Sequence, residues 1–229
     1  MNETQREFSV RYGSLNRVFR DFQLSAEVAP DQVPRLRQAA RTLAVLRTRV
    51  ERVEAPPEAA TLRVRLLEFL RQQEAIANEL LAVTLFVPKL GSAEKPLVAA
   101  GRRLRRGIEG ASVEEQAVVV RRYAADLRAI ARDLDELDPP ALLAPSHDAY
   151  VKQLRAYAAS SDALERGITA ADQAAVDAAV RRMQAAAAAP PGTFRAQQAA
   201  IKAYNARVRR VSTLGAAVER ERQRLEAEL

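Results

Sequence analysis

The chain has 229 residues, 48% of them apolar but only 5% aromatic, and a chain of this length can bury a core without a metal or disulfide. Cysteine is absent, which excludes a disulfide scaffold and thiolate chemistry. The net charge of +7 arises from 36 basic residues, all but four of them Arg, interleaved with 29 acidic ones. Abundant Ala and Leu together with only 8 Gly favour an all-helical protein.

The sequence predicts no transmembrane segment. Its longest apolar run, Leu80–Val87, is far shorter than the ~20 residues that cross a bilayer. The opening stretch MNETQREFSV lacks the apolar centre of a signal peptide. Two locations stay open: the cell envelope, if a signal segment has been removed, or the cytoplasm.

Apolar residues at spacings of three and four predict a series of helices that end at proline or glycine. The first covers about residues 3–27, and the second starts near Val33 and stops at Pro56 and Pro57. A third begins at once and is expected to end near Pro88, with a turn at Gly91 and Ser92. A fourth and shorter helix covers the stretch KPLVAAGRRLRRGI.

The second half of the chain predicts four more helices. Ser112 and Glu115 form a capping box that starts the fifth, and Pro139 and Pro140 stop it. The sixth runs to about Gly167, and Thr169 with Asp172 is expected to cap the seventh. After Pro190 the eighth helix occupies about residues 193–229. The prediction is an all-α, up-and-down antiparallel bundle of about seven or eight helices in a single domain, residues 1–229.

The chain also matches itself at a displacement of 84 residues. This shift brings apolar positions of one proline-hinged hairpin onto those of the other. The aligned pairs include Leu43 with Leu127, Leu46 with Ile130, Pro56 with Pro140, and Leu70 with Leu154. The pattern predicts a helix–Pro-Pro–helix hairpin used twice, with copies at about residues 31–90 and 112–168. Only prolines and apolar positions are shared, so we interpret the doubled prolines as structural hinges.

The polar motifs indicate no catalysis. His147 is the only histidine, too few for a zinc or di-iron site, and adjacent Ser146, His147 and Asp148 cannot form a relay on a helix. We expect His147 on the surface or in the first turn of a helix near the hinge. The acidic cluster at residues 133–138 is expected to be a solvated face, paired with Arg128 and Arg132. No catalytic, cofactor-binding or metal-ligating residue is predicted.

The densest positive run is RRLRR, which is the candidate contact with an anion or a membrane surface. Its basic members are Arg102, Arg103, Arg105 and Arg106. No aromatic residues or reading helix accompany the run, so nucleic acid is disfavoured as a partner.

The last helix has coiled-coil spacing, interrupted at Gly215 and Arg222. Its first half is expected to be core, whereas the charged second half either projects and pairs with another copy or frays. The candidate homo-oligomer contacts are Val211, Val218 and Leu225.

The stretch LDELDPPALLAPSHDAYVKQLRAYAASSDAL resembles a loose class of uncharacterised bacterial exported helical proteins, many of them lipoproteins. Their pattern is a helix ending in L-x-x-L-x-P-P, a spacer, a histidine and then a second helix with a run of Ala. The resemblance covers about residues 127–211, and it is weaker in the first copy, which has no histidine. It implies an envelope location but no activity and no site residues. The sequence departs from the class in lacking the signal and the lipid-bearing cysteine.

These observations leave three functions open. The first is a non-enzymatic, envelope-associated bundle that meets a membrane surface, a cell-wall polymer or a protein partner. The second is a carrier of an apolar or lipid-like molecule, with Phe69, Phe86 and the run LLAVTLFV lining the slot. The third is a cytosolic oligomer that binds an anionic polymer.

Overall fold

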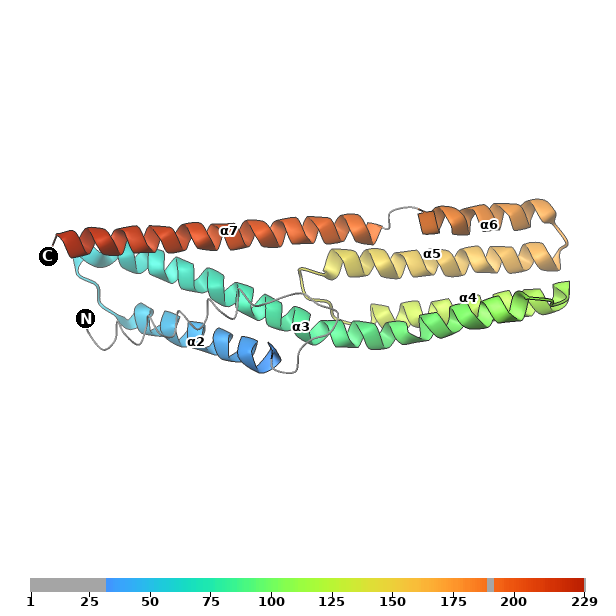
Figure 1. Ribbon diagram of the computed structural model, residues 1–229, viewed down its shortest axis with the longest axis horizontal. Helices are drawn as coiled ribbons and strands as arrows, with labels where there is room; N and C mark the ends of the chain where they lie inside the picture. The colour runs from blue at the N-terminus through green and yellow to red at the C-terminus, as the bar shows by residue number, and fades with distance from the viewer. Residues whose placement is uncertain (1–31, 189–191, 229) are drawn as a thin grey trace. The chain divides into compact units, whose positions relative to one another are not determined.

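The computed structural model describes residues 32–188 and 192–228, but not the side chains of residues 186–197 and 200. The described part belongs to the all-α class, with helices joined by short connections (Figure 1). It contains six α-helices and one short 3-10 helix, without any strand in this described part. The bounds are α2 Gln32–Arg52, η1 Pro57–Ala59, α3 Ala60–Ile108, α4 Val113–Asp135, α5 Ala144–Thr169, α6 Gln173–Ala188 and α7 Gly192–Ala227. The helix expected at residues 3–27 lies outside the described residues.

The longest helix differs from the prediction. Residues 60–108 form the single helix α3 with Pro88 inside it, where the spacing predicts two helices and a turn at Gly91. An internal proline costs about 3 kcal/mol, because one N–H···O bond is lost and the ring crowds the preceding turn. Packing offsets that cost on both sides: Phe86 is buried before the proline, and Leu97 packs against a core cluster after it.

Helix α3 also corrects the prediction that nothing in the chain could span a membrane. Together with η1 it contains an 18-residue window with a mean hydropathy of 1.2, enough by length and composition alone for a crossing. A core helix of a folded unit passes the same test, and 33% of the window is buried within the protein. Core packing therefore accounts for about a third of this apolar window.

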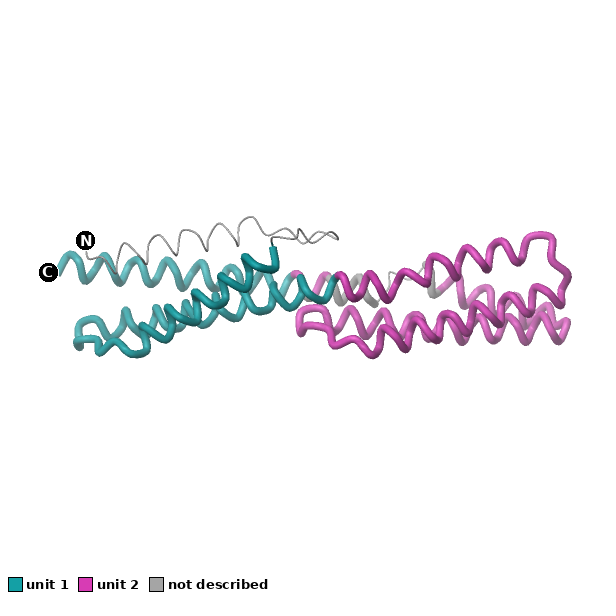
Figure 2. The backbone as a smooth tube through the Cα atoms, turned by 90° about the horizontal axis from the view of Figure 1, so that it is seen from below, with its two compact units in different colours: residues 1–87, 202–229 teal, residues 88–201 magenta. Residues whose placement is uncertain are grey.

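The chain divides into two compact units, coloured separately in Figure 2. Unit 1 comprises Met1–Val87 and Lys202–Leu229, and unit 2 comprises Pro88–Ile201. Described parts of unit 1 are α2, the first part of α3 and most of α7. Unit 2 holds the rest of α3 together with α4, α5 and α6.

In unit 1, α2 and α7 both run antiparallel to α3. Ion pairs show the register between α3 and α7: Arg65 pairs with Glu221 at 3.3 Å, and farther along α3 Glu79 pairs with Arg207. Residue numbers rise along one helix as they fall along the other. Leu and Phe side chains from α2 and α3 fill the space between the helices. The buried core cluster is Ala39, Ala40, Leu43, Leu46, Phe69, Leu70 and Ala77.

Unit 2 follows the same rule. Arg121 and Arg128 on α4 pair with Glu165 and Asp162 on α5, while Arg155 on α5 reaches back to α4. The two helices are therefore antiparallel, and their inward faces are apolar. The buried core cluster is Leu127, Ile130, Ala131, Leu134, Val151, Leu154 and Ala158.

Both doubled prolines lie between helices, as predicted. Pro56 is extended, with φ −62° and ψ 158°, and Pro57 begins η1. Pro140 precedes α5, and its carbonyl accepts from the N–H groups of Leu143 and Ala144 at 2.8 and 3.0 Å. Because proline disfavours helix in the residue before it, each pair ends one helix before the next begins.

Two predicted caps can be checked. The capping box is confirmed: Ser112 Oγ accepts from the Glu115 N–H at 3.3 Å, and Glu115 Oε2 accepts from the Ser112 N–H at 2.8 Å. Those hydrogen bonds, first the one from the Ser112 backbone, lower the pKa of the Glu115 carboxyl. Asp172 caps α6 by accepting from the Ala175 N–H at 3.0 Å, whereas Thr169 is the last residue of α5.

Candidate anion-binding groove

The four predicted arginines lie on the last turns of α3, and all are exposed. Here α3 closely approaches α4, because Gly107 carries no side chain: a Cβ at that position would stand 2.8 Å from a methyl carbon of Val119. The glycine allows the contact, and long arginine side chains border it. This juxtaposition follows from the tertiary packing of unit 2.

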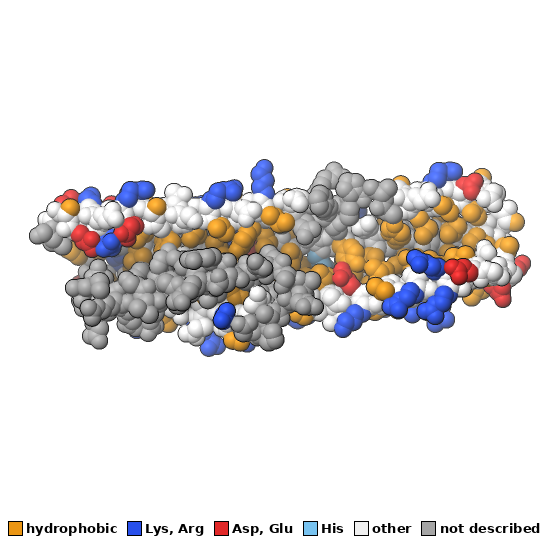
Figure 3. Space-filling model, in the orientation of Figure 1, with side chains coloured by type: hydrophobic (Ala, Val, Ile, Leu, Met, Phe, Trp, Pro, Cys, Tyr) orange, Lys and Arg blue, Asp and Glu red, His pale blue; other side chains and the backbone are white. Residues whose placement is uncertain are grey.

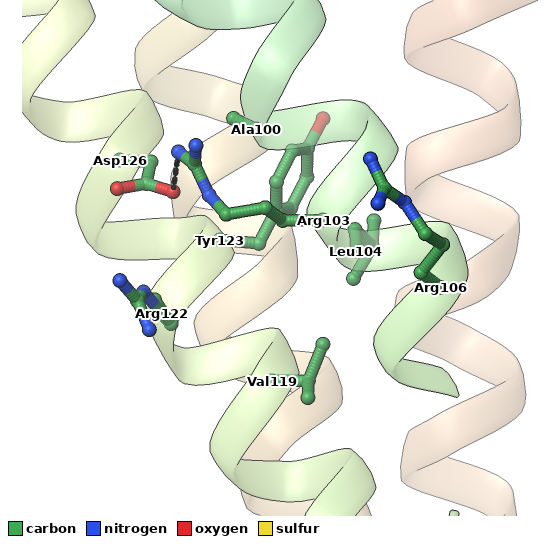
Figure 4. Close-up of a pocket in the computed structure, with 8 residues that line it drawn as sticks. All are labelled: Ala100, Arg103, Leu104, Arg106, Val119, Arg122, Tyr123 and Asp126. Carbon is green, nitrogen blue, oxygen red and sulfur yellow. Dashed lines mark hydrogen bonds and ion pairs between the residues drawn. The ribbon is translucent and has the colours of Figure 1, made fainter. Parts of the chain in front are cut away.

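A groove of ≈ 310 Å³ lies along this contact (Figure 4). Three of its side chains are arginines and one is a carboxylate. The lining residues are Ala100, Arg103, Leu104, Arg106, Val119, Arg122, Tyr123 and Asp126. Helix α3 and helix α4 each contribute four of them, so the groove exists only when the two helices pack.

The groove has an excess of positive charge. Arg103 donates to Asp126 at 2.8 Å, a pair drawn as the dashed line in Figure 4. Among the described residues, Arg106 and Arg122 form no ion pair within 4.0 Å. Elsewhere in unit 2 arginines such as Arg121 and Arg128 do pair with carboxylates. The guanidinium groups of Arg106 and Arg122 therefore remain available to an external anion, for which arginine offers several donors in one plane.

Between the charged groups the groove is apolar. Leu104 and Tyr123 lie between the two helices in Figure 4. Burial raises the pKa of the Tyr123 phenol, and the nearby Tyr157 adds to the effect, so the group is neutral near pH 7. A neutral phenol and a leucine present apolar surface to a ligand without adding a negative charge.

Two of the four predicted arginines lie at the groove, and a role in binding stays a prediction. Arg103 and Arg106 line the groove, whereas Arg102 and Arg105 are exposed on α3 but are not part of the lining. The α4 residues were missed because they come about one helix later in the chain. A signal existed in the stretch RRYAAD, where an arginine and a tyrosine adjoin.

His147 corrects the expectation of a surface histidine. It lies in the first turn of α5, as predicted, but only 6% of it is exposed. Its position explains the burial, because Val151 and Leu154 follow at i+4 and i+7 on the same inward face of α5.

The acidic cluster at residues 133–138 is partly as predicted. Arg132 lies 3.9 Å from Asp133, but Arg128 pairs with Asp162 instead, and Asp135 pairs with Arg155 at 2.7 Å. Within the described ranges, no group of three or more His, Cys, Asp or Glu side chains could hold a metal ion.

The candidate oligomer contacts lie on α7. Val211 and Val218 pack, partly buried, against the core of unit 1. Leu225 is half-buried, and the charged end of α7 is tied to unit 1 by Arg224, which donates to the Glu58 carbonyl at 3.3 Å. These contacts use the apolar stripe within the unit, and an oligomer contact stays a prediction.

The slot expected at Phe69 and Phe86 does not coincide with the cavities described for this structure. Phe69 is part of the unit 1 core, with its ring 3.1 Å from the position of a Cβ on Gly215. Phe86 is 3% exposed. The missing side chain at Gly215, which interrupts the stripe of α7, thus makes room for an aromatic ring.

Comparison with known proteins adds no relative. No family model matches the sequence, no curated protein matches it, and no solved structure matches it.

Proposed function

We propose that the protein is a non-enzymatic binding protein of the cell envelope, whose α3–α4 groove binds the anionic head groups of lipids. The observation that carries the proposal is the gathering of Arg103, Arg106 and Arg122 around one groove with a single carboxylate. Each Arg near an anionic membrane surface strengthens binding by roughly fivefold. Three of them therefore provide a substantial and salt-dependent affinity.

The form of the groove supports a head group rather than a polymer. Its charge is concentrated on one stretch of α3 and one of α4, and its floor is apolar at Leu104 and Tyr123. A nucleic-acid surface would be expected to extend a basic track with several stacking aromatics. With one histidine and no cysteine, the chain is also poorly supplied with nucleophiles and proton-transfer groups.

We further propose that the two hairpins are copies of one ancestral hairpin. Burial supports the displacement of 84 residues, because seven buried positions of the first hairpin align with seven buried positions of the second. The pairs are Leu36 with Val120, Ala40 with Ala124, Leu43 with Leu127, Leu46 with Ile130, Leu67 with Val151, Leu70 with Leu154, and Ala77 with Ser161. The same displacement aligns buried positions in the helix before the doubled proline and in the helix after it. Two unrelated amphipathic helices can match at some displacement, but nothing would require both helices of a hairpin to match at the same one.

The copies differ where the groove lies. Tyr123 and Arg122 in the second copy correspond to Ala39 and Gln38 in the first. On this proposal the hairpin supplies the scaffold in both units, and only the second copy contributes residues to the groove, where they face the end of α3.

The test is co-sedimentation of the purified full chain with phosphatidylcholine vesicles, with and without phosphatidylglycerol. The wild type is expected to bind only the anionic vesicles and to lose affinity steeply between about 50 and 200 mM salt. Replacing Arg103, Arg106 and Arg122 by Gln is expected to weaken binding by about 100-fold.

A matched variant controls for net charge. Arg37→Gln, Arg41→Gln and Arg182→Gln remove the same three charges from exposed positions outside the groove. This control is expected to keep most of the binding. Equal losses in the two variants, or no binding of the wild type at low salt, would contradict the proposal. Retention of duplex DNA as strong as that of vesicles would favour an anionic polymer instead.

A further inference from the structure

A second cavity of unit 2 adjoins the basic groove. It has a volume of ≈ 230 Å³, is lined by side chains from α3, α4, α5 and α6, and is partly open to solvent. Its walls are almost entirely apolar. They include Leu104, Ile108, Val120, Leu164, Val180 and Met183.

Three residues with polar groups line this cavity: Ser161, Gln184 and Tyr123. Ser161 is fully buried, and its hydroxyl donates to the Tyr157 carbonyl at 2.9 Å. Gln184 is exposed at the margin, and Tyr123 is shared with the basic groove. A cavity with such walls does not hold water well, because water needs several polar partners, but it accepts an apolar group.

The cavity and the groove share two walls, Leu104 and Tyr123. The cavity is smaller than the ~300–1,000 Å³ of a typical complete ligand site, so it suits a chain rather than a whole molecule. The groove places arginine guanidinium groups beside these shared walls, and the cavity adds apolar side chains. This combination matches a molecule with an anionic end and an apolar end.

Apolar surface is also open to solvent beside the cavity. Ile108 on α3 and Val180 on α6 are each 36% exposed, although both line it. Figure 3 shows apolar side chains gathered over unit 2 between α6 and α3, with Lys and Arg side chains along the α3 edge. An apolar chain can therefore enter from solvent without unfolding the unit.

We infer that unit 2 binds a single-chain anionic amphiphile of the fatty-acid or lysophospholipid type. The negative head group pairs with Arg106 and Arg122, and the chain passes Leu104 and Tyr123 into the apolar cavity. This inference rests on the proposed function and deepens it, because it specifies a lipid with one chain inside the protein. The inference keeps the carrier hypothesis of the sequence analysis but places the apolar binding site in unit 2, not at Phe69 and Phe86.

The experiment is calorimetric titration of the full chain with butanoate, octanoate, decanoate and the neutral decanol. Affinity for the carboxylates is expected to rise about fourfold for each methylene that enters the cavity. Decanol is expected to bind at least about tenfold more weakly than decanoate, because it lacks the charge that the arginines recognise. Equal affinity for decanol and decanoate would overturn the assignment of the head group.

Val180→Phe tests the chain site, because a larger ring at this partly exposed position fills the cavity from its margin. It is expected to abolish the dependence on chain length. Val98→Phe is the matched control on α3, 61% exposed and outside both linings, and it is expected to leave the dependence unchanged. Circular dichroism of both variants checks that each one folds.

The two proposals fail in different ways. If anionic vesicles bind but affinity does not depend on chain length, this inference is wrong and the proposed function stands. If neither vesicles nor decanoate bind, both are wrong. If decanoate binds with the length dependence and Val180→Phe leaves it intact, the chain lies elsewhere and the cavity assignment fails.

Discussion

The end of α3 in unit 2 and the end of α7 in unit 1 are both rich in arginine but use it differently. In α7 the arginines alternate with glutamates: Arg222 pairs with Glu219 and Glu226, and Arg224 pairs with Glu221 and Glu228. These spacings of three and four are the ones at which helical side chains meet.

The end of α3 has no such partners within its own helix. The stretch GRRLRRGI contains no acid, and among the described residues its arginines form one ion pair, that of Arg103 with Asp126 on α4. Arginine content alone would rank the two segments as similar, although only the α7 segment also carries glutamates. The difference shows that an arginine is available for binding where no carboxylate pairs with it, as at Arg106, and is neutralised where neighbouring glutamates do, as at Arg222.

The buried cores of the two units are alike in composition, and the prediction with the largest expected effect compares their contributions to stability. Leu43→Ala and Leu127→Ala remove fully buried side chains at corresponding positions of the two hairpins, at 0% and 1% exposure. Each is expected to cost about 2–5 kcal/mol of unfolding free energy, from lost transfer energy and a residual cavity. Urea unfolding followed by circular dichroism measures it.

Exposed valines provide the controls. Val64→Ala in unit 1 and Val118→Ala in unit 2 change side chains that are 64% and 60% exposed. Both are expected to lie within about 0.5 kcal/mol of the wild type. The two cores are not equivalent if, in one unit but not in the other, the core substitution lowers the free energy of unfolding no more than the control does.

A second prediction converts the end of α7 into a segment like α3. Glu219→Gln and Glu226→Gln together remove both partners of Arg222. The freed guanidinium is expected to strengthen binding to phosphatidylglycerol vesicles by about fivefold. Co-sedimentation measures the change.

The control for this variant raises the net charge equally without freeing an arginine. Glu54→Gln and Asp138→Asn alter two exposed carboxylates that pair with no arginine among the described residues and lie outside the groove. If the control strengthens binding as much as the α7 variant, the pairing of arginine is not what separates the two segments.

The smallest expected effect concerns two glycines of α3. At Gly107 a Cβ would meet Val119 at 2.8 Å, whereas at Gly101 nothing lies within 4 Å. Gly101→Ala is expected to stabilise the protein by about 1 kcal/mol through helix propensity. Gly107→Ala is expected to give a net loss of about 1 kcal/mol, because overpacking against a stiff valine outweighs the same gain.

Thermal unfolding measures both changes, and vesicle binding adds a second readout. Gly107→Ala pushes α3 away from α4 and is expected to weaken binding by the groove, while Gly101→Ala leaves it unchanged. A stabilising Gly107→Ala with unchanged binding would show that the close approach of the helices is not needed.

Much of the local structure was determined by the sequence itself. The doubled prolines ended helices because their rings disfavour helix in the preceding residue, and Ser112 with Glu115 started one because both side chains satisfy free N–H groups. The apolar stripes identified core positions such as Leu43 and Leu127 before any packing was known. These features depend on neighbours within about one turn of a helix.

The tertiary structure decided what local pattern left open. Pro88 stays inside α3 because residues on both sides of it are packed, and His147 is buried because the inward face of α5 continues through it. The groove depends on the packing of two helices, because Arg122 and Tyr123 come near Arg103 only when α3 folds against α4. A sequence pattern records the face of one helix, whereas a binding site depends on which faces of two helices lie together.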